Sequence, residues 1–133
     1  MATAGLAPTH IVLIGLDEAL AGELRKTLSG LPTSIHSTAC SAQRLDWEQI
    51  ERADCIFGPS DASQLQTLLD AIHRHCPGTP VIAASRHPED AEWIRAMEAG
   101  ATDYCATPFE PLQMDWILRN ALMSPVRTSA PVV

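Results

Sequence analysis

The run His73-Arg74-His75-Cys76 holds the side chains most familiar as metal ligands. Imidazole and thiolate groups bind zinc, but all of them must converge on one point. If this run is helical, positions i, i+2 and i+3 do not lie on one face, and no partner pair occurs at zinc-site spacing. The four cysteines of the chain also lack CxxC spacing. We therefore predict reduced thiols and no metal site.

Three carboxylates, those of Asp17, Glu18 and Asp61, follow apolar runs of the sequence. In one interpretation Asp17 and Glu18 bind a divalent cation and Asp61 accepts a transferred group. In the other, Asp17 and Asp61 lie at helix N-termini, where acids cap free N–H groups and interact favourably with the helix dipole. Because a working site demands accurate placement, we favour the capping interpretation.

Five segments of the chain have the composition of β-strands. Three are short and apolar, as strands buried on both faces are, and the first and the last of these three begin with a polar residue or proline. Another is β-prone but polar, which predicts an edge strand, and the last is short. Gly58-Pro59 is expected to break the strand that precedes it. The strands are predicted at residues 10–14, 33–40, 53–57, 80–84 and 103–106.

Helical spacing of apolar residues separates these strands. Leucines at 20, 24 and 28 predict the first helix, and a proline at position 88 in the first turn predicts the start of the fourth. The fourth helix has a stripe of Ile94, Met97 and Ala101. The last helix places five apolar side chains on one face, namely Met114, Ile117, Leu118, Ala121 and Leu122.

Strands that alternate with helices predict an α/β fold, a doubly wound five-stranded parallel sheet with its site at the carboxyl ends of the strands. The 133 residues, 46% hydrophobic and 19% charged, suit one domain at 9–123 and exclude a disordered chain. We expect a flexible tail at 1–8, and at 124–133 a second flexible tail or the start of a linker.

The charge and hydropathy of the chain limit its partners and its location. The net charge of −7 repels phosphate backbones, so we expect this domain to bind no nucleic acid. No apolar run is long enough to span a membrane, and the N-terminus lacks the features of a signal peptide. We therefore expect a soluble, cytoplasmic protein that makes no contact with a membrane.

The segment AMEAGATDYCATPFEPLQMDWIL carries a group of residues at a specific spacing: Ala99, Gly100, Ala101, Asp103, Tyr104, Pro108 and Phe109. It resembles the fourth helix, fifth strand and fifth helix of the receiver domain of bacterial response regulators. The segments TPVIAAS and THIVLIGLDEALAGELRKTL resemble the fourth strand and the first strand and helix of that family. The resemblance covers residues 9–123 and implies a flavodoxin-like (βα)5 fold with strand order 2-1-3-4-5.

The resemblance also implies a chemistry that this chain lacks. The family transfers a phosphoryl group to an aspartate after the third strand, with Mg²⁺ held by acids after the first strand. A hydroxyl after the fourth strand and a lysine after the fifth assist. Here the acidic pair aligns with Gly15 and Leu16, the acceptor with Pro59 (or Gly58 one residue earlier) and the lysine with Thr107, while Ser85 and the switch aromatic Tyr104 remain.

We therefore expect no phosphorylation at the usual position, no bound Mg²⁺ and no cofactor. The single lysine of the chain, Lys26, lies on the predicted first helix and cannot replace the missing one. The Thr107–Pro108 peptide is expected to be cis by the same resemblance.

The last predicted helix leaves Leu112 and Trp116 on the face opposite its apolar stripe, and Trp93 lies at the flank of the preceding helix. The resemblance implies that the fourth helix, fifth strand and fifth helix form a docking and dimerisation face. Because tryptophan is enriched at binding hot spots, we predict that these three residues mark an interface. In the alternative, the helix tilts and buries Trp116.

These observations favour a non-enzymatic, receiver-like signal-transduction module of a two-component or phosphorelay system that acts by binding a protein. The partner would be a histidine kinase, an output domain or another signalling protein, or a second copy in a homodimer. One alternative is a domain that binds a nucleotide or flavin in an uncharged crevice between Gly15 and Gly58. Another is a receiver phosphorylated at the displaced Asp61.

Overall fold

The computed structural model describes residues 9–123, in which five strands alternate with five helices. The predicted tails at 1–8 and 124–133 lie outside the described residues. The strands are β1 (Thr9–Ile14), β2 (Ile35–Cys40), β3 (Cys55–Pro59), β4 (Val81–Ser85) and β5 (Asp103–Ala106). The helices are α1 (Glu18–Ser29), α2 (Trp47–Arg52), α3 (Ala62–His75), α4 (Asp90–Ala99) and α5 (Pro111–Met123).

All five strands run parallel in one sheet of order β2-β1-β3-β4-β5. The predicted flavodoxin-like α/β fold is confirmed. Because the chain leaves β1 toward β2 on one side and later returns to β3 on the other, the topological switch point lies between β1 and β3. The carboxyl ends of both strands therefore border the candidate site.

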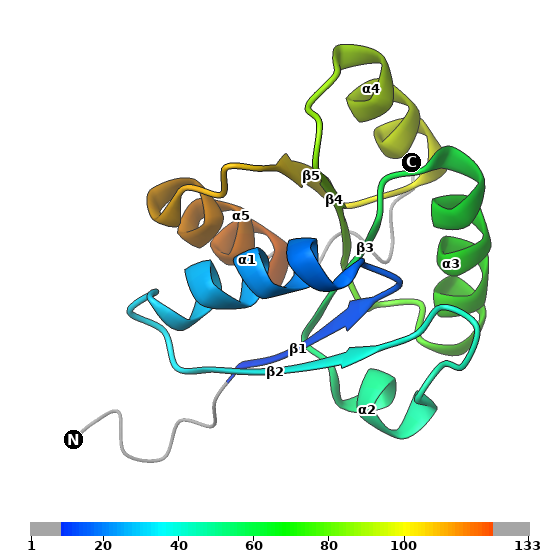
Figure 1. The fold of residues 1–133 in the computed structure, drawn as a ribbon. Helices are drawn as coiled ribbons and strands as arrows, with labels where there is room; N and C mark the ends of the chain where they lie inside the picture. Colours follow the sequence, from blue (N-terminus) through cyan, green and yellow to red (C-terminus); the bar gives the residue numbers. More distant parts are fainter. Residues whose placement is uncertain (1–8, 124–133) are drawn as a thin grey trace.

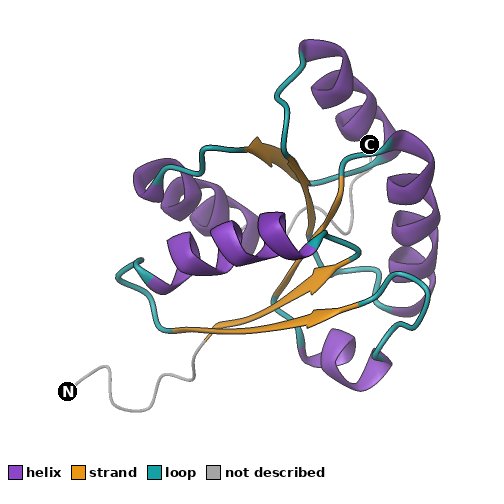
Figure 2. Ribbon diagram, viewed as in Figure 1, coloured by secondary structure: helices purple, strands orange, loops and turns teal. Residues whose placement is uncertain are grey.

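The sheet separates two apolar layers (Figures 1 and 2). On one side, α1 and α5 pack against the odd-numbered residues of β1, Ile11 and Leu13. On the other side, α2, α3 and α4 pack against Val12 and Ile14. This alternation is the period-2 pattern of a strand that is buried on both faces, as the apolar run in β1 predicted. No helix within residues 9–123 is long and apolar enough to cross a membrane.

The expectation that Gly58-Pro59 breaks the third strand is wrong. Both residues belong to β3, are buried and pair with Ala83 and Ala84 of β4. A β-carbon on Gly58 would lie 2.5 Å from Cδ2 of Leu68, so glycine here lets α3 approach the sheet closely. Pro59 is the last residue of the strand, where a missing N–H disturbs the ladder least.

Two expectations for α4 are also wrong. Pro88 lies outside the helix, before the N-cap residue Glu89, rather than in its first turn. Of the predicted apolar stripe, Ala101 is buried beyond the end of the helix, but Ile94 and Met97 are 47% and 38% exposed. The buried side chain of α4 is Ala96, which is small enough to bring the helix backbone close to its neighbours.

Candidate functional site

The carboxyl edge of the sheet brings together four positions of the receiver pattern. The sequence departs from the pattern at three of them and agrees with it at the fourth, Ser85. Gly15 follows β1, Pro59 ends β3, Ser85 ends β4 and Thr107 follows β5. A shallow hollow of about 210 Å³ lies there, lined by Gly15, Leu16, Asp17, Leu20, Pro59, Ser60, Asp61, Gln64, Ala84 and Arg86. Gly15 has φ +72°, a left-handed conformation that side chains disfavour.

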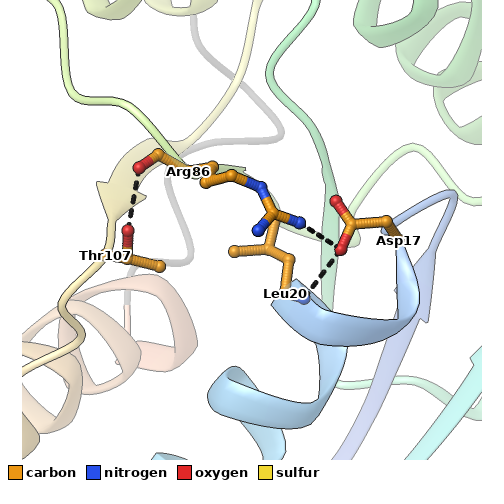
Figure 3. A network of polar contacts seen from close by, with 4 residues as sticks. All are labelled: Asp17, Leu20, Arg86 and Thr107. Atoms are coloured by element: carbon orange, nitrogen blue, oxygen red, sulfur yellow. Dashed lines mark hydrogen bonds and ion pairs between the residues drawn. The ribbon is translucent and has the colours of Figure 1, made fainter.

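Asp17 is the N-cap of α1 and also the partner of a cation. Its Oδ1 accepts a hydrogen bond from the backbone N–H of Leu20 at 2.8 Å and forms an ion pair with Arg86 from the loop after β4 (Figure 3). The hydrogen bond from Arg86, together with that from Leu20, lowers the pKa of Asp17 below its ordinary value. The Oδ1 atom of Asp17 and the charge of its carboxylate are therefore engaged within the protein.

Asp61 caps α3 in the same way. Its Oδ2 accepts from the backbone N–H of Gln64 at 3.1 Å and from the hydroxyl of Ser63 at 2.9 Å. These hydrogen bonds lower the pKa of Asp61. Glu18 is exposed in the first turn of α1. The capping interpretation of Asp17 and Asp61 is confirmed.

Thr107 uses its hydroxyl to connect two loops. Its Oγ1 donates to the backbone carbonyl oxygen of Arg86 at 2.8 Å, so the loop after β5 holds the loop that carries the guanidinium (Figure 3). The backbone N–H of Thr107 donates to the carbonyl oxygen of Ser85 at 3.0 Å. The Thr107–Pro108 peptide is cis, as expected.

Ser85 is buried, with 3% of its surface exposed, and satisfies backbone groups of its own loop. Its hydroxyl donates to the carbonyl oxygen of His87 at 3.0 Å and accepts from the N–H of His87 at 3.1 Å. Next to it, the carboxylate of Glu92 accepts hydrogen bonds from Ser60 and from Tyr104, which occupies the position of the family's switch aromatic in the sequence resemblance. Tyr104 is only partly buried, in contact with the core beneath α4.

The residues of the crevice do not fit a magnesium ion. Such an ion needs several converging oxygen ligands, and the positions of the family's acidic pair hold Gly15 and Leu16. Asp17 is already bound to Arg86 and to the end of α1. No group of three or more histidine, cysteine, aspartate or glutamate side chains between residues 9 and 123 is arranged to hold a metal.

The run at the end of α3 is also engaged in packing. The ring of His75 lies against Trp47 of α2, with the ring centroids 4.3 Å apart. Burial, followed by the nearby Glu51, raises the pKa of the Cys76 thiol. A raised pKa disfavours the thiolate that a metal would need.

A larger hollow of about 460 Å³ lies beside the crevice, between the loop after β2 and α3. Gly58 does not line it, so the predicted crevice between Gly15 and Gly58 does not exist as described; Gly58 is covered by Leu68. The lining carries amide, hydroxyl and apolar groups but no charged side chain. It consists of Gly15, Ala42, Gln43, Leu45, Ser63, Gln64, Thr67, Leu68 and Ala71.

The three predicted interface residues are exposed large side chains. Trp116 is 63% exposed, Leu112 86% and Trp93 47%. The alternative in which α5 tilts and buries Trp116 is therefore wrong. Ile94 and Met97 extend the apolar surface along α4 beside Trp93.

Arg86, Ser60 and Glu92 are the site residues that sequence reasoning did not single out. Arg86 directly follows Ser85, so its place beside the crevice was open to prediction, but its choice of Asp17 as partner was not. Glu92 has the sequence appearance of an ordinary acid in the first turn of a helix. Its contacts depend on how α4 is rotated, and the apolar stripe misleads about that rotation.

This arrangement, a five-stranded parallel sheet of order 2-1-3-4-5 with five helices, is a flavodoxin-like or CheY-like α/β fold. No family model matches the chain. The KDP operon transcriptional regulatory protein KdpE of Escherichia coli is 27% identical over 126 residues, 92% of this chain and 55% of that protein. Protein PetR of Rhodobacter capsulatus is 30% identical over 124 residues, 88% of this chain and 49% of that protein.

Among solved structures, the signal receiver domain of an HD domain-containing protein from Pseudomonas fluorescens is 27% identical, with a TM-score of 0.65. The match covers 87% of this chain and 95% of that one. Relatives and solved structures together support a response regulator receiver domain of the CheY-like fold. The chain spans about half the length of the curated relatives that it matches.

Proposed function

We propose that this chain is a receiver-type signalling module that accepts no phosphoryl group at the usual position and acts, without catalysis, by binding a protein. The observation that carries the proposal is the charge of the crevice. Among the residues that line it, Arg86 is the one cation, and it pairs with Asp17. Asp61, the remaining charged lining residue, caps α3.

An acyl phosphate would bring about two negative charges into this crevice. Pro59 supplies no carboxylate to accept the group, and Thr107 supplies no cation to stabilise it. The hydroxyl of Thr107 is also engaged with the carbonyl oxygen of Arg86. Phosphorylation would thus have to use Asp61 and Arg86, which already cap α3 and pair with Asp17, and it would lack the acidic pair that holds the metal in the family.

Mass spectrometry tests this proposal. The intact protein, incubated with acetyl phosphate and Mg²⁺ beside a receiver domain that has the full site, should gain no mass, and calorimetry should detect no saturable Mg²⁺ site below about 1 mM. An adduct of one phosphate would contradict the proposal. If Asp61→Asn abolished that adduct, Asp61 would be the displaced acceptor.

The proposed docking face is the surface of α4, β5 and α5 that carries Trp93, Leu112 and Trp116. Single exposed apolar side chains are normal on a monomer, but several large ones gathered on one surface are typical of a binding site. We propose a second copy of this chain as the occupant, with a histidine kinase or an output domain as the alternative partner. Cytoplasmic location is part of the same proposal, since two-component partners act there.

A nucleotide or flavin finds little support at this edge of the sheet. The 460 Å³ hollow is large enough for part of such a ligand, but its lining has no cation for a phosphate group. Asp17 and Asp61, which line the neighbouring crevice, would repel one. In a thermal-shift screen, nucleotides and flavins should leave the melting temperature unchanged, and a clear rise would favour the ligand-binding alternative.

A further inference from the structure

Helix α4 is held by little apolar packing. Ala96 is its buried side chain, while Trp93, Ile94 and Met97 face solvent. Its N-cap residue, Glu89, makes no capping hydrogen bond through its side chain. By comparison, α1 buries three leucines and α3 buries four apolar side chains, and an aspartate caps each of them. Apolar packing through Ala96 and Ala99 is therefore slight, and polar contacts have a larger share in fixing the position of α4.

Glu92 supplies contacts that reach from α4 to two other elements. Its Oε2 accepts from the hydroxyl of Ser60, in the loop after β3, at 3.0 Å. Its Oε1 accepts from the hydroxyl of Tyr104, on β5, at 2.6 Å. Glu92 is partly buried, so an unpaired carboxylate at this position would be costly, whereas this one has a donor on each oxygen.

The ionisation states suit such a contact. Burial alone would raise the pKa of Glu92, but hydrogen bonds involving Ser85, Tyr104 and Ser60 outweigh it and lower the pKa below the ordinary value. Burial and the neighbouring Glu92 carboxylate raise the pKa of Tyr104, so its phenol stays protonated and donates. The carboxylate is ionised and the phenol neutral throughout the physiological range.

We propose that Glu92 is a positioning residue whose carboxylate tethers α4 to β5 and to the loop after β3. The tether runs from Ser60, beside the substituted acceptor position, to the helix that presents Trp93 one residue further on. It therefore links the crevice to the surface of α4, and it sets where the apolar side chains of that helix lie. The role of α4 in docking rests on the proposed function; the tether itself does not.

Hydrogen exchange, read by mass spectrometry on the full chain at a concentration where it is monomeric, tests the tether. Glu92→Ala should speed exchange of the amides of residues 90–99 about tenfold, since a hydrogen bond to a charged group is worth at least that factor. Exchange in α1 and α3 should stay unchanged. The matched control is Glu98→Ala, which removes an exposed carboxylate from the same helix.

Two conservative variants keep the test decisive if Glu92→Ala folds poorly. Tyr104→Phe and Ser60→Ala each remove one hydroxyl, and each should speed exchange in α4 by a smaller factor. Combining Tyr104→Phe with Glu92→Ala should add little to Glu92→Ala alone, because both remove the same hydrogen bond. The proposal is overturned if α4 exchanges no faster than in Glu98→Ala, or if exchange rises equally in α1 and α3. Neither result depends on docking, so a monomeric protein would overturn the second-copy occupant without touching the tether.

Discussion

Replacing Trp116 by alanine separates a docking residue from a core residue. A fully buried tryptophan removes about 150–250 Å² from water, and truncation to alanine then costs about 3–5 kcal/mol. Trp116 is 63% exposed, so about a third of its surface is covered. Roughly 80 Å² at ~25 cal/mol per Å² gives at most about 2 kcal/mol. Alanine returns up to about 0.7 kcal/mol through its higher helix propensity. We expect Trp116→Ala to lower the free energy of unfolding by about 1–1.5 kcal/mol.

Two measurements on the same samples check this expectation. Urea unfolding at low protein concentration gives the stability of the monomer, and sedimentation equilibrium gives the dissociation constant of the dimer. If Trp116 belongs to the docking face, the dissociation constant should rise about tenfold or more, as at other interface tryptophans. Trp47→Phe, on α2 and on the opposite side of the sheet, is the matched control and should leave association unchanged.

Three outcomes would contradict the reasoning. A stability loss of about 3–5 kcal/mol with unchanged association would return Trp116 to the core. A small stability loss with unchanged association would remove Trp116 from the docking face. A wild-type chain that stays monomeric at every concentration would exclude the second copy as occupant and leave a different protein as the partner.

Three further predictions concern packing, acid stability and thiol chemistry. Gly58→Ala should destabilise the fold by about 1–3 kcal/mol, because the new methyl group would lie 2.5 Å from Cδ2 of Leu68. In a Leu68→Ala background the same change should cost less. Urea unfolding of the double variant, compared with Leu68→Ala alone, measures this difference. The folded-state pKa values of Asp17 and Asp61 are lowered, so their stabilisation is present above the unfolded pKa and is lost as the pH falls below about 4. The urea midpoint should therefore fall on acidification, and less steeply in Asp17→Asn or Asp61→Asn; equal slopes would contradict this. Burial raises the pKa of Cys105 to about 12, so its thiol should react with a disulfide reagent only after unfolding, and rapid native labelling would show that the site opens.

The fold was predictable because the strands can be identified from short local patterns of apolar and β-prone residues. The apolar runs at β1, β3 and β4 are continuous, and a continuous run suits a strand covered on both sides. The end of β3 was predicted wrongly because glycine and proline usually interrupt strands. Here Gly58 makes room for the side chain of Leu68 on α3. Leu68 lies ten residues further along the chain, so a local sequence pattern does not reveal this contact.

The rotation of α4 was mistaken for a different reason. An apolar stripe at helical spacing normally faces the core, but Ile94 and Met97 face solvent while Ala96 is buried. Amphipathic spacing shows only that a helix has an apolar face, and a docking surface satisfies it as well as a core does. The polar partners of Glu92 depend on this rotation, so they too lay beyond the reach of the sequence.

The exposed tryptophan was predictable because α5 already has a complete core face. Met114, Ile117 and Leu118 fill the layer beside α1, and Trp116 projects away from them. Helix α5 has apolar side chains on two faces, and the set of Met114, Ile117 and Leu118 was enough to fill the core. Helix α4 has one apolar stripe, so the sequence offered no other face to assign to the core. The same helical projection therefore succeeded on one helix and failed on the other.

The crevice holds a cation, Arg86, but at another position than the lysine of the receiver pattern. In the receiver pattern that the sequence resembles, a lysine after the fifth strand stabilises an added negative charge, and Thr107 stands there instead. The guanidinium of Arg86 comes from the neighbouring loop and is bound to Asp17. The hydroxyl of Thr107 donates a hydrogen bond to the backbone carbonyl oxygen of Arg86 and so holds that loop. A cation that already has an anion gains little from a second one, because the second anion must compete with the first. The pair therefore leaves no unpaired cation among the residues that line the crevice, and Asp61 adds a further negative charge there.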